Sequence, residues 1–305
     1  MGILAVALVL IVIKKLYNWI QVKLVKPNFE GKTVWITGAS SGIGEQLAKD
    51  FSRLGASLII SSRKAQDLEK VKSQCKDPSK VTVLPLDMSK TKEVIKQTED
   101  FIKDLEKQNK KLDIVIENAG VSMRSEFKDY SFENHEYMTN LNYNGPVAHV
   151  KGLLDHFVRN KSGHIVLINS IAGLLSPGMR TSYVGSKHAL RGFFDSLRAE
   201  VSEFNIKVSS IYPGYVQTNV SANALSGEAG QSFGKTDGNI QEGETIEKFA
   251  EQAILAIYKQ KNDAVITKSI KHELGVYMRN VSFDLVHWLT RKNVQQQKDA
   301  LKKAI

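Results

Sequence analysis

The sequence has a single cysteine, Cys75, among its 305 residues. One thiol cannot form a disulfide within the chain, so the sequence excludes a disulfide-rich secreted scaffold and suits a reducing compartment. It also lacks a cluster of histidine, cysteine and acidic residues with the spacing of a metal site. We therefore expect no bound metal.

The sequence likewise has no concentrated block of charge. Its formal net charge is +10, but the lysines and arginines are spread along the chain and no nucleic-acid-binding motif is present. We therefore expect no nucleic-acid partner. An anionic membrane surface or a phosphate-bearing cofactor would suit the positive charge equally well.

Long hydrophobic runs are absent except at the N-terminus. Residues 2–13 are uncharged and apolar, and Lys14 and Lys15 follow them. The run is shorter than a usual membrane span, and it has neither the basic start nor the cleavage site of a signal peptide. We interpret residues 2–20 as an uncleaved membrane anchor. The alternative, a helix packed on the protein's own core, is disfavoured because nothing polar recurs to form a solvent face.

The location of the rest of the chain follows from this anchor. If the anchor spans the bilayer, the lysines after it place the following domain in the cytoplasm. The endoplasmic reticulum membrane is the default organelle for such an arrangement. We divide the chain into an anchor and linker (1–27), a catalytic domain (28–270) and an apolar, aromatic C-terminal segment with a polar tail (271–305).

A glycine-rich turn follows the first predicted strand of the domain. Residues 32–37 (KTVWIT) read as a strand, and an apparent helix runs from the turn to about residue 54. Such a turn lets backbone N–H groups approach a pyrophosphate, and the helix N-terminus favours its negative charge. We predict cofactor contacts at Gly38, Ser40, Ser41, Gly42, Ile43 and Gly44.

The second predicted strand, residues 58–60, indicates which cofactor binds. An NAD site usually has an acid after this strand for the ribose 2′-hydroxyl, whereas an NADP site often has an arginine for the 2′-phosphate. Here Ser62 and Arg63 follow the strand, and there is no acid. The predicted cofactor is therefore NADP(H), with NAD(H) as the less favoured choice.

Further strands alternate with helices along the chain, at residues 81–86, 113–116, 165–169 and 264–267. This alternation predicts an α/β fold with a Rossmann-type doubly wound parallel sheet, whose ligand lies at the carboxyl ends of the strands. Four polar residues fall at such ends: Arg63, Asp87, Asn118 and Ser170.

Tyr183 and Lys187 stand four residues apart on a predicted helix, so they share one face. A nearby ammonium would lower the pKa of the Tyr183 phenol, which could then exchange a proton with a reacting oxygen. Ser170 could hold the same oxygen by a hydrogen bond. A lone Tyr-x-x-x-Lys is more often a surface tyrosine with a solvated lysine, and it is the cofactor site upstream that makes this pair informative.

In this order the motifs resemble those of the short-chain dehydrogenase/reductase family, over roughly residues 30–270. Within the family the chain most resembles the membrane-anchored members 7 and 7B, through its apolar N-terminus and its Pro-Gly-Tyr-Val-Gln-Thr-Asn-Val segment. The matching pieces are Thr37-Gly38-x-x-x-Gly42-x-Gly44, Asp87, Asn118-Ala119-Gly120, Asn142, Ser170, Tyr183-x-x-x-Lys187 and Pro213-Gly214-x-x-x-Thr218.

The resemblance implies direct hydride transfer, with Tyr183 as the general acid or base and Ser170 polarising the substrate carbonyl. It implies that Lys187 lowers the pKa of Tyr183 and binds the nicotinamide ribose, and that Asn142 holds a water connecting Lys187 to solvent. It adds cofactor contacts at Asp87, Met88, Asn118, Ala119, Gly120, Tyr183, Lys187, Pro213, Gly214, Val216 and Thr218.

The chain departs from the family at Glu117, where the family commonly has asparagine. A carboxylate at this position would need a partner if it is buried. Two further segments stay open. Residues 219–244 read either as a substrate lid or as a disordered insertion. The apolar stretch within 271–305 reads as a core helix, a homodimer surface or a flap lying on the membrane.

We therefore predict an NADP(H)-dependent oxidoreductase that interconverts a carbonyl and an alcohol on a lipophilic substrate. Steroids, retinoids and long-chain lipid ketones all fit, including those of a 3-ketosphinganine or acyl-dihydroxyacetone-phosphate reductase, because a fold does not fix a substrate. One alternative is a membrane-tethered nucleotide-binding or scaffold protein without turnover. Another is a soluble sugar or polyol dehydrogenase, for which the first 25 residues would be incidental.

Overall fold

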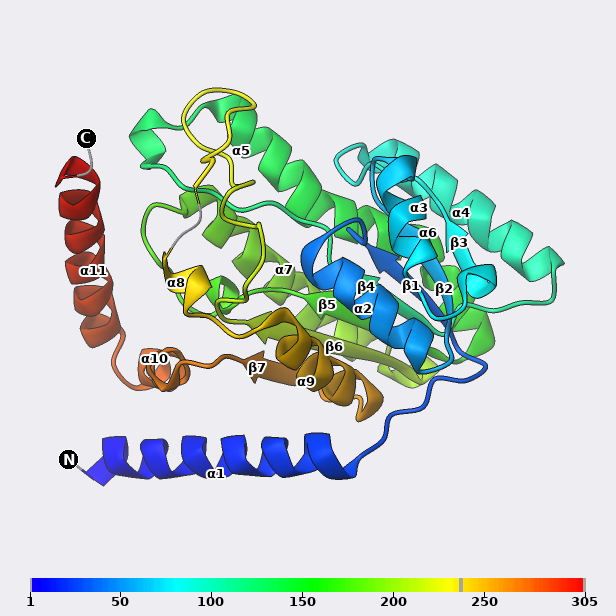
Figure 1. The fold of residues 1–305 in the computed structure, drawn as a ribbon, viewed down its shortest axis with the longest axis horizontal. Helices are drawn as coiled ribbons and strands as arrows, with labels where there is room; N and C mark the ends of the chain where they lie inside the picture. The colour runs from blue at the N-terminus through cyan, green and yellow to red at the C-terminus, as the bar shows by residue number, and fades with distance from the viewer. Residues whose placement is uncertain (1, 236–237, 304–305) are drawn as a thin grey trace.

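A seven-stranded parallel sheet forms the centre of the molecule, with the strand order β3-β2-β1-β4-β5-β6-β7 (Figure 1). The computed structural model describes residues 2–235 and 238–303. The predicted doubly wound α/β fold is confirmed. The strands are β1 Thr33–Thr37, β2 Ser57–Ser61, β3 Val81–Val83, β4 Ile114–Glu117, β5 Gly163–Ile168, β6 Ile206–Pro213 and β7 Asp263–Ile266.

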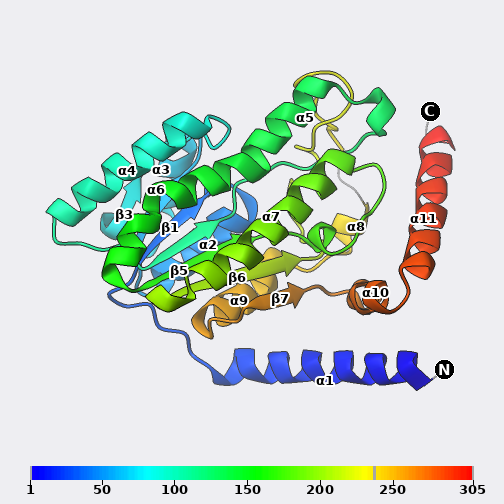
Figure 2. The ribbon, with the colours of Figure 1, turned by 180° about the vertical axis from the view of Figure 1, so that it is seen from behind.

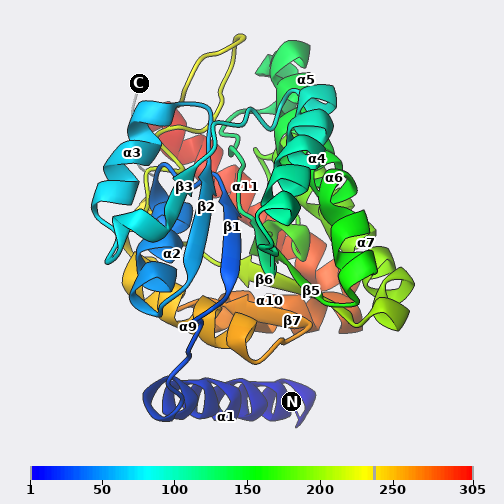
Figure 3. The ribbon, with the colours of Figure 1, turned by 90° about the vertical axis from the view of Figure 1, so that its right-hand side faces the viewer.

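Helices cover both faces of this sheet, with α2, α3 and α9 on one side and α4, α6 and α7 on the other (Figure 3). The alternation within β1 shows why both layers are needed. Val34 and Ile36 belong to the core under α2 and α9, whereas Trp35 belongs to the core under α4 and α6. The helices of this part are α2 Gly42–Arg53, α3 Ala65–Ser73, α4 Thr91–Lys107, α5 Phe132–Thr139, α6 Gly145–Asn160, α7 Thr181–Glu200, α8 Gly238–Gln241 and α9 Ile246–Tyr258.

The predicted strand bounds differ from the observed ones chiefly at β3. The strand ends at Val83, three residues before the predicted end. Leu84 and Leu86 nevertheless donate backbone hydrogen bonds to Ile60 and Ser62, so the chain stays extended beside β2. It thereby carries Asp87 to the carboxyl edge of the sheet.

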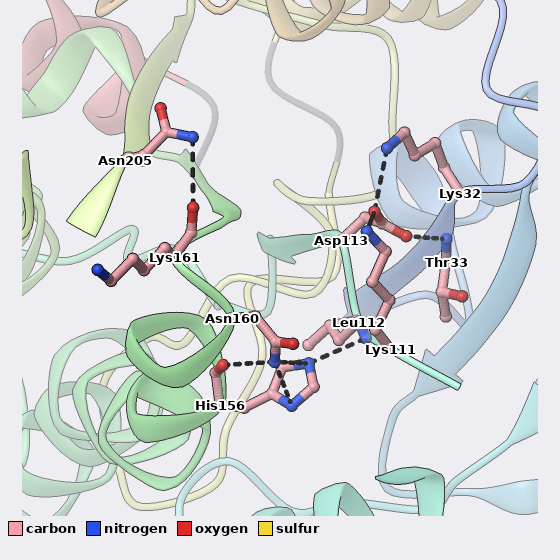
Figure 4. Close-up of polar contacts among 9 residues, drawn as sticks. All are labelled: Lys32, Thr33, Lys111, Leu112, Asp113, His156, Asn160, Lys161 and Asn205. Atoms are coloured by element: carbon pink, nitrogen blue, oxygen red, sulfur yellow. Dashed lines mark hydrogen bonds and ion pairs between the residues drawn. The ribbon is translucent and has the colours of Figure 1, made fainter. Parts of the chain in front are cut away.

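Asp113 joins the starts of β1 and β4 at the opposite edge of the sheet (Figure 4). Its side chain, in a residue 7% exposed, accepts hydrogen bonds from Lys32 Nζ at 3.1 Å and from the Thr33 N–H at 3.0 Å. The neighbouring Leu112 N–H donates to His156 Nε2 of α6 at 3.2 Å. These bonds stabilise the sheet far from the predicted cofactor site.

Helix α1, Gly2–Leu24, lies along the outside of the domain next to α9 and α10 (Figures 1 and 2). Within it, Ala5–Leu24 is long and apolar enough to cross a membrane, with a mean hydropathy of 1.6. The expectation that nothing polar recurs to form a solvent face stays compatible with the structure. Lys14, Asn18 and Gln21 do recur at helical spacing, but they contact the domain.

The C-terminal segment forms α10, Ile270–Val281, and α11, Phe283–Lys303. Both lie outside the sheet layers, and α10 contacts α1 (Figure 1). Glu273 is the buried residue of α10, so neither helix resembles a core helix in the part of the chain that the structure describes. The last two residues of the predicted tail, and Met1 of the predicted anchor, lie outside the described residues.

Residues 219–244, predicted as a lid or an insertion, fold over the loop that follows β4. Leu225 pairs with Met123 in a parallel bridge, and Asn134 Nδ2 donates to the Glu228 carbonyl at 2.8 Å. Residues 236 and 237 of this segment lie outside the described residues. Its role as a substrate lid stays a prediction.

Candidate active site

The glycine-rich turn packs against the loop after β4. Gly38 has φ +65°, and a Cβ there would lie 2.8 Å from the Ala119 Cα. A Cβ on Gly44 would lie 2.3 Å from the Gly38 oxygen. Both positions therefore require glycine. Ser41 precedes α2 without a side-chain capping hydrogen bond, so the first N–H groups of α2 remain available to an anionic ligand.

Asn118 and Thr37 hold this turn in place. Asn118 Nδ2 donates to the Thr37 carbonyl at 3.0 Å and to the Gly38 carbonyl at 3.1 Å. Thr37 Oγ1 accepts hydrogen bonds from the backbone N–H groups of Asn118 and Ala119. The predicted cofactor residues of β1 and β4 thus form one hydrogen-bonded unit.

Glu117, the departure from the family pattern, is buried beneath this unit and does have a partner. Its Oε1 lies 2.6 Å from His149 Nδ1, and both side chains are fully buried. Its Oε2 accepts from Thr37 Oγ1 at 3.3 Å. Trp35 packs edge-on against the imidazole, with ring centroids 4.4 Å apart. His149 lies 32 residues away on α6, and no sequence pattern indicates the pairing.

Asn142 occupies a π-helical turn, Asn140–Asn144, between α5 and α6. Its side chain accepts from the Val121 N–H at 2.8 Å and donates to the Val121 carbonyl at 2.9 Å. Its Nδ2 also lies 3.2 Å from Ser186 Oγ. Asn142 therefore fixes the loop after β4 against α7. The water that the family resemblance assigns to it stays a prediction.

Ser170, Tyr183 and Lys187 come together at the carboxyl end of β5. The Ser170 and Tyr183 side chains are hydrogen-bonded to each other, and Ser170 Oγ also accepts from the Ala172 N–H at 3.1 Å. Lys187 is 4% exposed, and its Nζ donates to the Ile168 carbonyl at 3.3 Å. This Nζ lies 5.9 Å from the centroid of the Tyr183 ring.

Burial has the largest effect on the pKa of Tyr183 and raises it above the ordinary value. The hydrogen bond from Ser170 and the positive charges of Arg124 and Arg180 act in the opposite direction. The lowered pKa that the spacing of Tyr183 and Lys187 predicts is therefore corrected by the structure, because desolvation outweighs the groups that favour the phenolate.

Burial also lowers the pKa of Lys187 to about 8. An ammonium enclosed in this way loses its hydration, which disfavours the charged form. Lys187 is near Gly120 as well, since a Cβ on that glycine would lie 3.8 Å from the Lys187 Nζ. The lysine thus lies near both the loop after β4 and the Tyr183 ring.

The end of β2 offers polar groups for a ribose substituent. Ser62 Oγ is buried and has no hydrogen-bond partner in the protein. Arg63 is exposed, and its Nη1 donates to the Tyr137 hydroxyl at 2.8 Å. Asp87 Oδ1 accepts from the Ser89 N–H at 3.0 Å, while Met88 beside it is 3% exposed. An unpartnered hydroxyl beside an arginine fits a phosphate-bearing ribose.

The segment after β6 approaches the glycine-rich turn from the other side. The Gly214 N–H donates to the Ile266 carbonyl at 2.8 Å, and Val216 is 5% exposed. A Cβ on Gly42 would lie 3.6 Å from Thr218 Cγ2. The predicted residues Pro213 to Thr218 therefore flank the same space as the turn at Gly38.

A cavity of about 1300 Å³ opens beside Ser170 and Tyr183. Arg124 and Arg180 line it close enough to act electrostatically on Tyr183, although neither belongs to a motif that the sequence analysis found. Arg124 Nη1 donates to Ser122 Oγ and to the Met123 carbonyl, both at 2.8 Å. Much of the opposite wall is apolar and comes partly from the C-terminal helices: Leu175, Val220, Ile240, Leu274, Met278 and Leu289.

Within residues 2–235 and 238–303 no group of three histidine, cysteine or acidic side chains could hold a metal ion.

Comparison with known families gives one match over most of the domain, since the model described as short chain dehydrogenase covers residues 32–229. The chain is 36% identical to the fruit-fly (Drosophila melanogaster) protein named dehydrogenase/reductase SDR family protein 7-like, over 99% of this chain and 92% of that protein. It is 39% identical to human dehydrogenase/reductase SDR family member 7, over 71% of this chain and 65% of that protein. Mouse member 7B is 34% identical over 84% of this chain and 79% of its own length.

Solved structures share the fold. A short-chain dehydrogenase/reductase from Burkholderia phymatum in complex with NAD has a TM-score of 0.71 at 21% identity, over 85% of this chain and 96% of that one. An alcohol dehydrogenase from the archaeon Thermococcus sibiricus, complexed with 5-hydroxy-NADP, has a TM-score of 0.64 at 25% identity, over 77% and 96%. Neighbours of this fold thus bind either nicotinamide cofactor.

Proposed function

This chain belongs to the short-chain dehydrogenase/reductase family, and on that premise we propose that it is an NADP(H)-dependent oxidoreductase interconverting a lipophilic carbonyl compound and its alcohol. The observation that carries the proposal is that Ser170 and Tyr183, hydrogen-bonded to each other, line a large, partly apolar cavity, with Lys187 Nζ next to the Tyr183 ring. A protein that only bound nucleotide would have no evident use for a buried proton-transfer group at that place.

In the direction of reduction, Tyr183 donates its phenolic proton to the substrate oxygen as the carbonyl becomes an alkoxide. When bound, a nicotinamide cofactor would supply the hydride for the carbonyl carbon. Ser170, hydrogen-bonded to the same phenol, orients and polarises the carbonyl. Arg124 and Arg180 act with Ser170 to favour the phenolate that remains.

Lys187 has the role of holding the nicotinamide ribose, because its Nζ lies between the loop after β4 and Tyr183. Its depressed pKa, about 8, allows it to give or accept a proton near neutral pH. In the oxidative direction each transfer is reversed, and Tyr183 is the base.

The preference for NADP(H) rests on the end of β2. Ser62 Oγ and the Arg63 guanidinium are the groups that would hold the 2′-phosphate, and the position has no carboxylate to repel it. The Arg63→Ser variant should raise the KM for NADPH far more than the KM for NADH. Equal changes in the two values would argue against this assignment.

The substrate class follows from the cavity wall, whose apolar side chains favour a steroid, a retinoid or a long-chain ketone. We assign catalysis to residues 28–270 and membrane association to residues 2–20. We further propose that the protein resides on the endoplasmic reticulum membrane with its catalytic domain in the cytoplasm. A homodimer is compatible with this arrangement.

The decisive experiment measures NADPH consumption by the full-length protein in detergent micelles, with steroid, retinal, long-chain and short-chain carbonyl compounds. Tyr183→Phe should lower kcat by about 10²- to 10⁴-fold, the range typical of a lost general acid, while NADPH binding is retained. Tyr258→Phe, at an exposed position on α9, is the matched control. NADPH binding without turnover of any compound would favour a tethered binding protein instead.

A further inference from the structure

Helix α1 exposes its apolar side and turns polar side chains toward the domain, the reverse of an ordinary surface helix. Its outward side is apolar, and its aliphatic and aromatic side chains there are between about one third and three quarters exposed. A surface helix in water normally turns such a side toward the core. The outward residues include Val9, Leu10, Ile13, Leu16, Trp19 and Leu24.

The inward side of α1 carries the polar groups. Lys15 Nζ donates to the Thr267 carbonyl at 2.6 Å, at the end of β7. Asn18 Oδ1 accepts from Lys261 Nζ at 3.2 Å. Gln21 Oε1 accepts from the lysine at position 259. These contacts follow one another at helical spacing, so a polar stripe lies on the domain, beside the fully buried Ile11.

Glu273 of α10 anchors the same stripe. It is 3% exposed, and its carboxylate lies 3.4 Å from Lys15 Nζ and 3.7 Å from Lys14 Nζ. A buried carboxylate requires a compensating charge, and α1 supplies two. The contact between α1 and the domain therefore includes specific ionic contacts besides the apolar packing of Ile11.

These contacts are incompatible with α1 crossing a bilayer. In the candidate span Ala5–Leu24, Lys14 and Lys15 straddle the midpoint, where charged side chains are most costly. A spanning α1 would leave the domain surface, and Glu273 would lose both cations. The apolar side chains that make the segment resemble a membrane span lie on the outward side of the helix. The polar side chains that attach it to the domain lie on the opposite side.

We propose that α1 lies in the plane of the membrane surface, with its apolar side in the lipid and its polar stripe on its own domain. The partner is the acyl and headgroup boundary of a bilayer, which accepts helices with tryptophan and leucine on one side. Lys23, whose Nζ lies 3.8 Å from the centroid of the Trp19 ring, sits where an interfacial aromatic residue and a headgroup would meet. The proposal rests on the membrane association proposed above and specifies its geometry.

This placement brings the active-site cavity to the bilayer. Helix α10 contacts α1 through Glu273, while its residues Leu274, Gly275 and Met278 line the cavity. One helix thus separates the lipid-facing α1 from the space beside Tyr183. A lipophilic substrate could enter that space from the membrane surface without crossing bulk water.

The test asks whether the N-terminus and the catalytic domain lie on the same side of the membrane. The full-length chain, with a short hydrophilic epitope tag before Met1, is synthesised in the presence of sealed microsomes, which are then treated with protease from outside. An in-plane α1 leaves the tag and the catalytic domain on the same side, so both are digested together. A tag protected while the domain is digested, or the reverse, would overturn the proposal.

Two double variants test whether the lysines keep α1 from crossing the bilayer. In Lys14→Leu/Lys15→Leu the charges at the midpoint are gone, and we expect most of the tag to become protected. A tag that stays digestible would overturn the role given to these lysines. Lys103→Leu/Lys107→Leu, at exposed positions of α4, is the matched control.

Membrane binding itself is measured separately, by flotation with the microsomes. Val12→Glu/Leu16→Glu on the outward side should reduce the floated fraction at least tenfold. Wild-type protein that does not float would refute the proposed membrane association as well. NADPH turnover in detergent is independent of both readouts, so a failure of the proposed enzymatic activity would be recognised on its own.

Discussion

Replacing His149 by leucine would leave the Glu117 carboxylate buried without its closest partner. Both side chains are fully buried and their polar atoms are 2.6 Å apart. Removing one member of such a pair typically costs about 3–5 kcal/mol, since the remaining charge keeps its desolvation penalty. The hydrogen bond from Thr37 Oγ1, at 3.3 Å, offsets only part of this loss, because it is a long bond from a neutral hydroxyl.

The double variant Glu117→Leu/His149→Leu should recover most of that loss. Replacing both members of a buried ion pair by apolar residues of similar volume is often neutral or stabilising. The Thr37 hydroxyl would keep its contact with the Ile116 carbonyl at 3.3 Å. The single change Glu117→Leu should be intermediate, at about 1–3 kcal/mol, because it removes only the acceptor of one imidazole hydrogen bond.

The assay is urea unfolding of the four proteins in the same detergent, followed by far-ultraviolet circular dichroism. Trp35 fluorescence serves as a local probe, because its ring lies against His149. The coupling free energy between the two positions should reach at least about 2 kcal/mol. Costs that simply add, or a His149→Leu variant within about 1 kcal/mol of wild type, would refute a mutually dependent pair.

Three further predictions concern packing and pH. Gly214→Ala should raise the KM for NADPH, because a Cβ there would lie 2.3 Å from Thr267 Oγ1; Gly192→Ala, with open space around it, is the control, and an unchanged KM would contradict the reasoning. Asp113→Ala should cost about 1–3 kcal/mol, seen as a lower Tm with kcat unchanged. Burial, the largest cause, and the charge of Lys207 lower the pKa of His164 to about 4, below its ordinary 6.5. The stability linked to this group is therefore complete above pH 6.5 and falls as the pH drops towards 4, by at most about 3 kcal/mol; His164→Asn should reduce that acid loss in Tm measurements at pH 7.5 and 4.5.

Most of the sheet could be predicted from the sequence, because most strands are short apolar runs followed by a polar or glycine residue. Buried parallel strands give such runs, and the carboxyl ends of parallel strands meet at one edge, so the residues after the strands were expected to be neighbours. Asn118 and Gly38 illustrate this, since their contact follows from the strand order alone. Strand β6, whose apolar run is interrupted by Lys207, Ser209 and Ser210, was not predicted. Element ends, such as that of β3, are less predictable, because backbone hydrogen bonds continue past the regular strand.

The partners of buried charges could not be predicted. Glu117 meets His149, and Glu273 meets Lys14 and Lys15, across 32 and more than 250 residues of sequence, and no spacing rule connects such distant positions. The direction in which the pKa of Tyr183 is shifted could not be predicted either. Local spacing identifies a nearby lysine, whereas the larger effect of burial depends on everything that packs around the phenol.

The residues proposed to bind the cofactor and those that form the far wall of the cavity come from different parts of the chain. The groups proposed to bind cofactor and move protons lie within residues 32–229, which the family model matches, because parallel strand ends must present them to a ligand of fixed shape. The far wall of the cavity is contributed partly by α10 and α11, outside that range. These helices are attached to the rest of the molecule through contacts such as those of Glu273 with Lys14 and Lys15 of α1. We therefore expect substrate choice to be determined by this wall, which is why the motifs indicate the reaction and leave the substrate open.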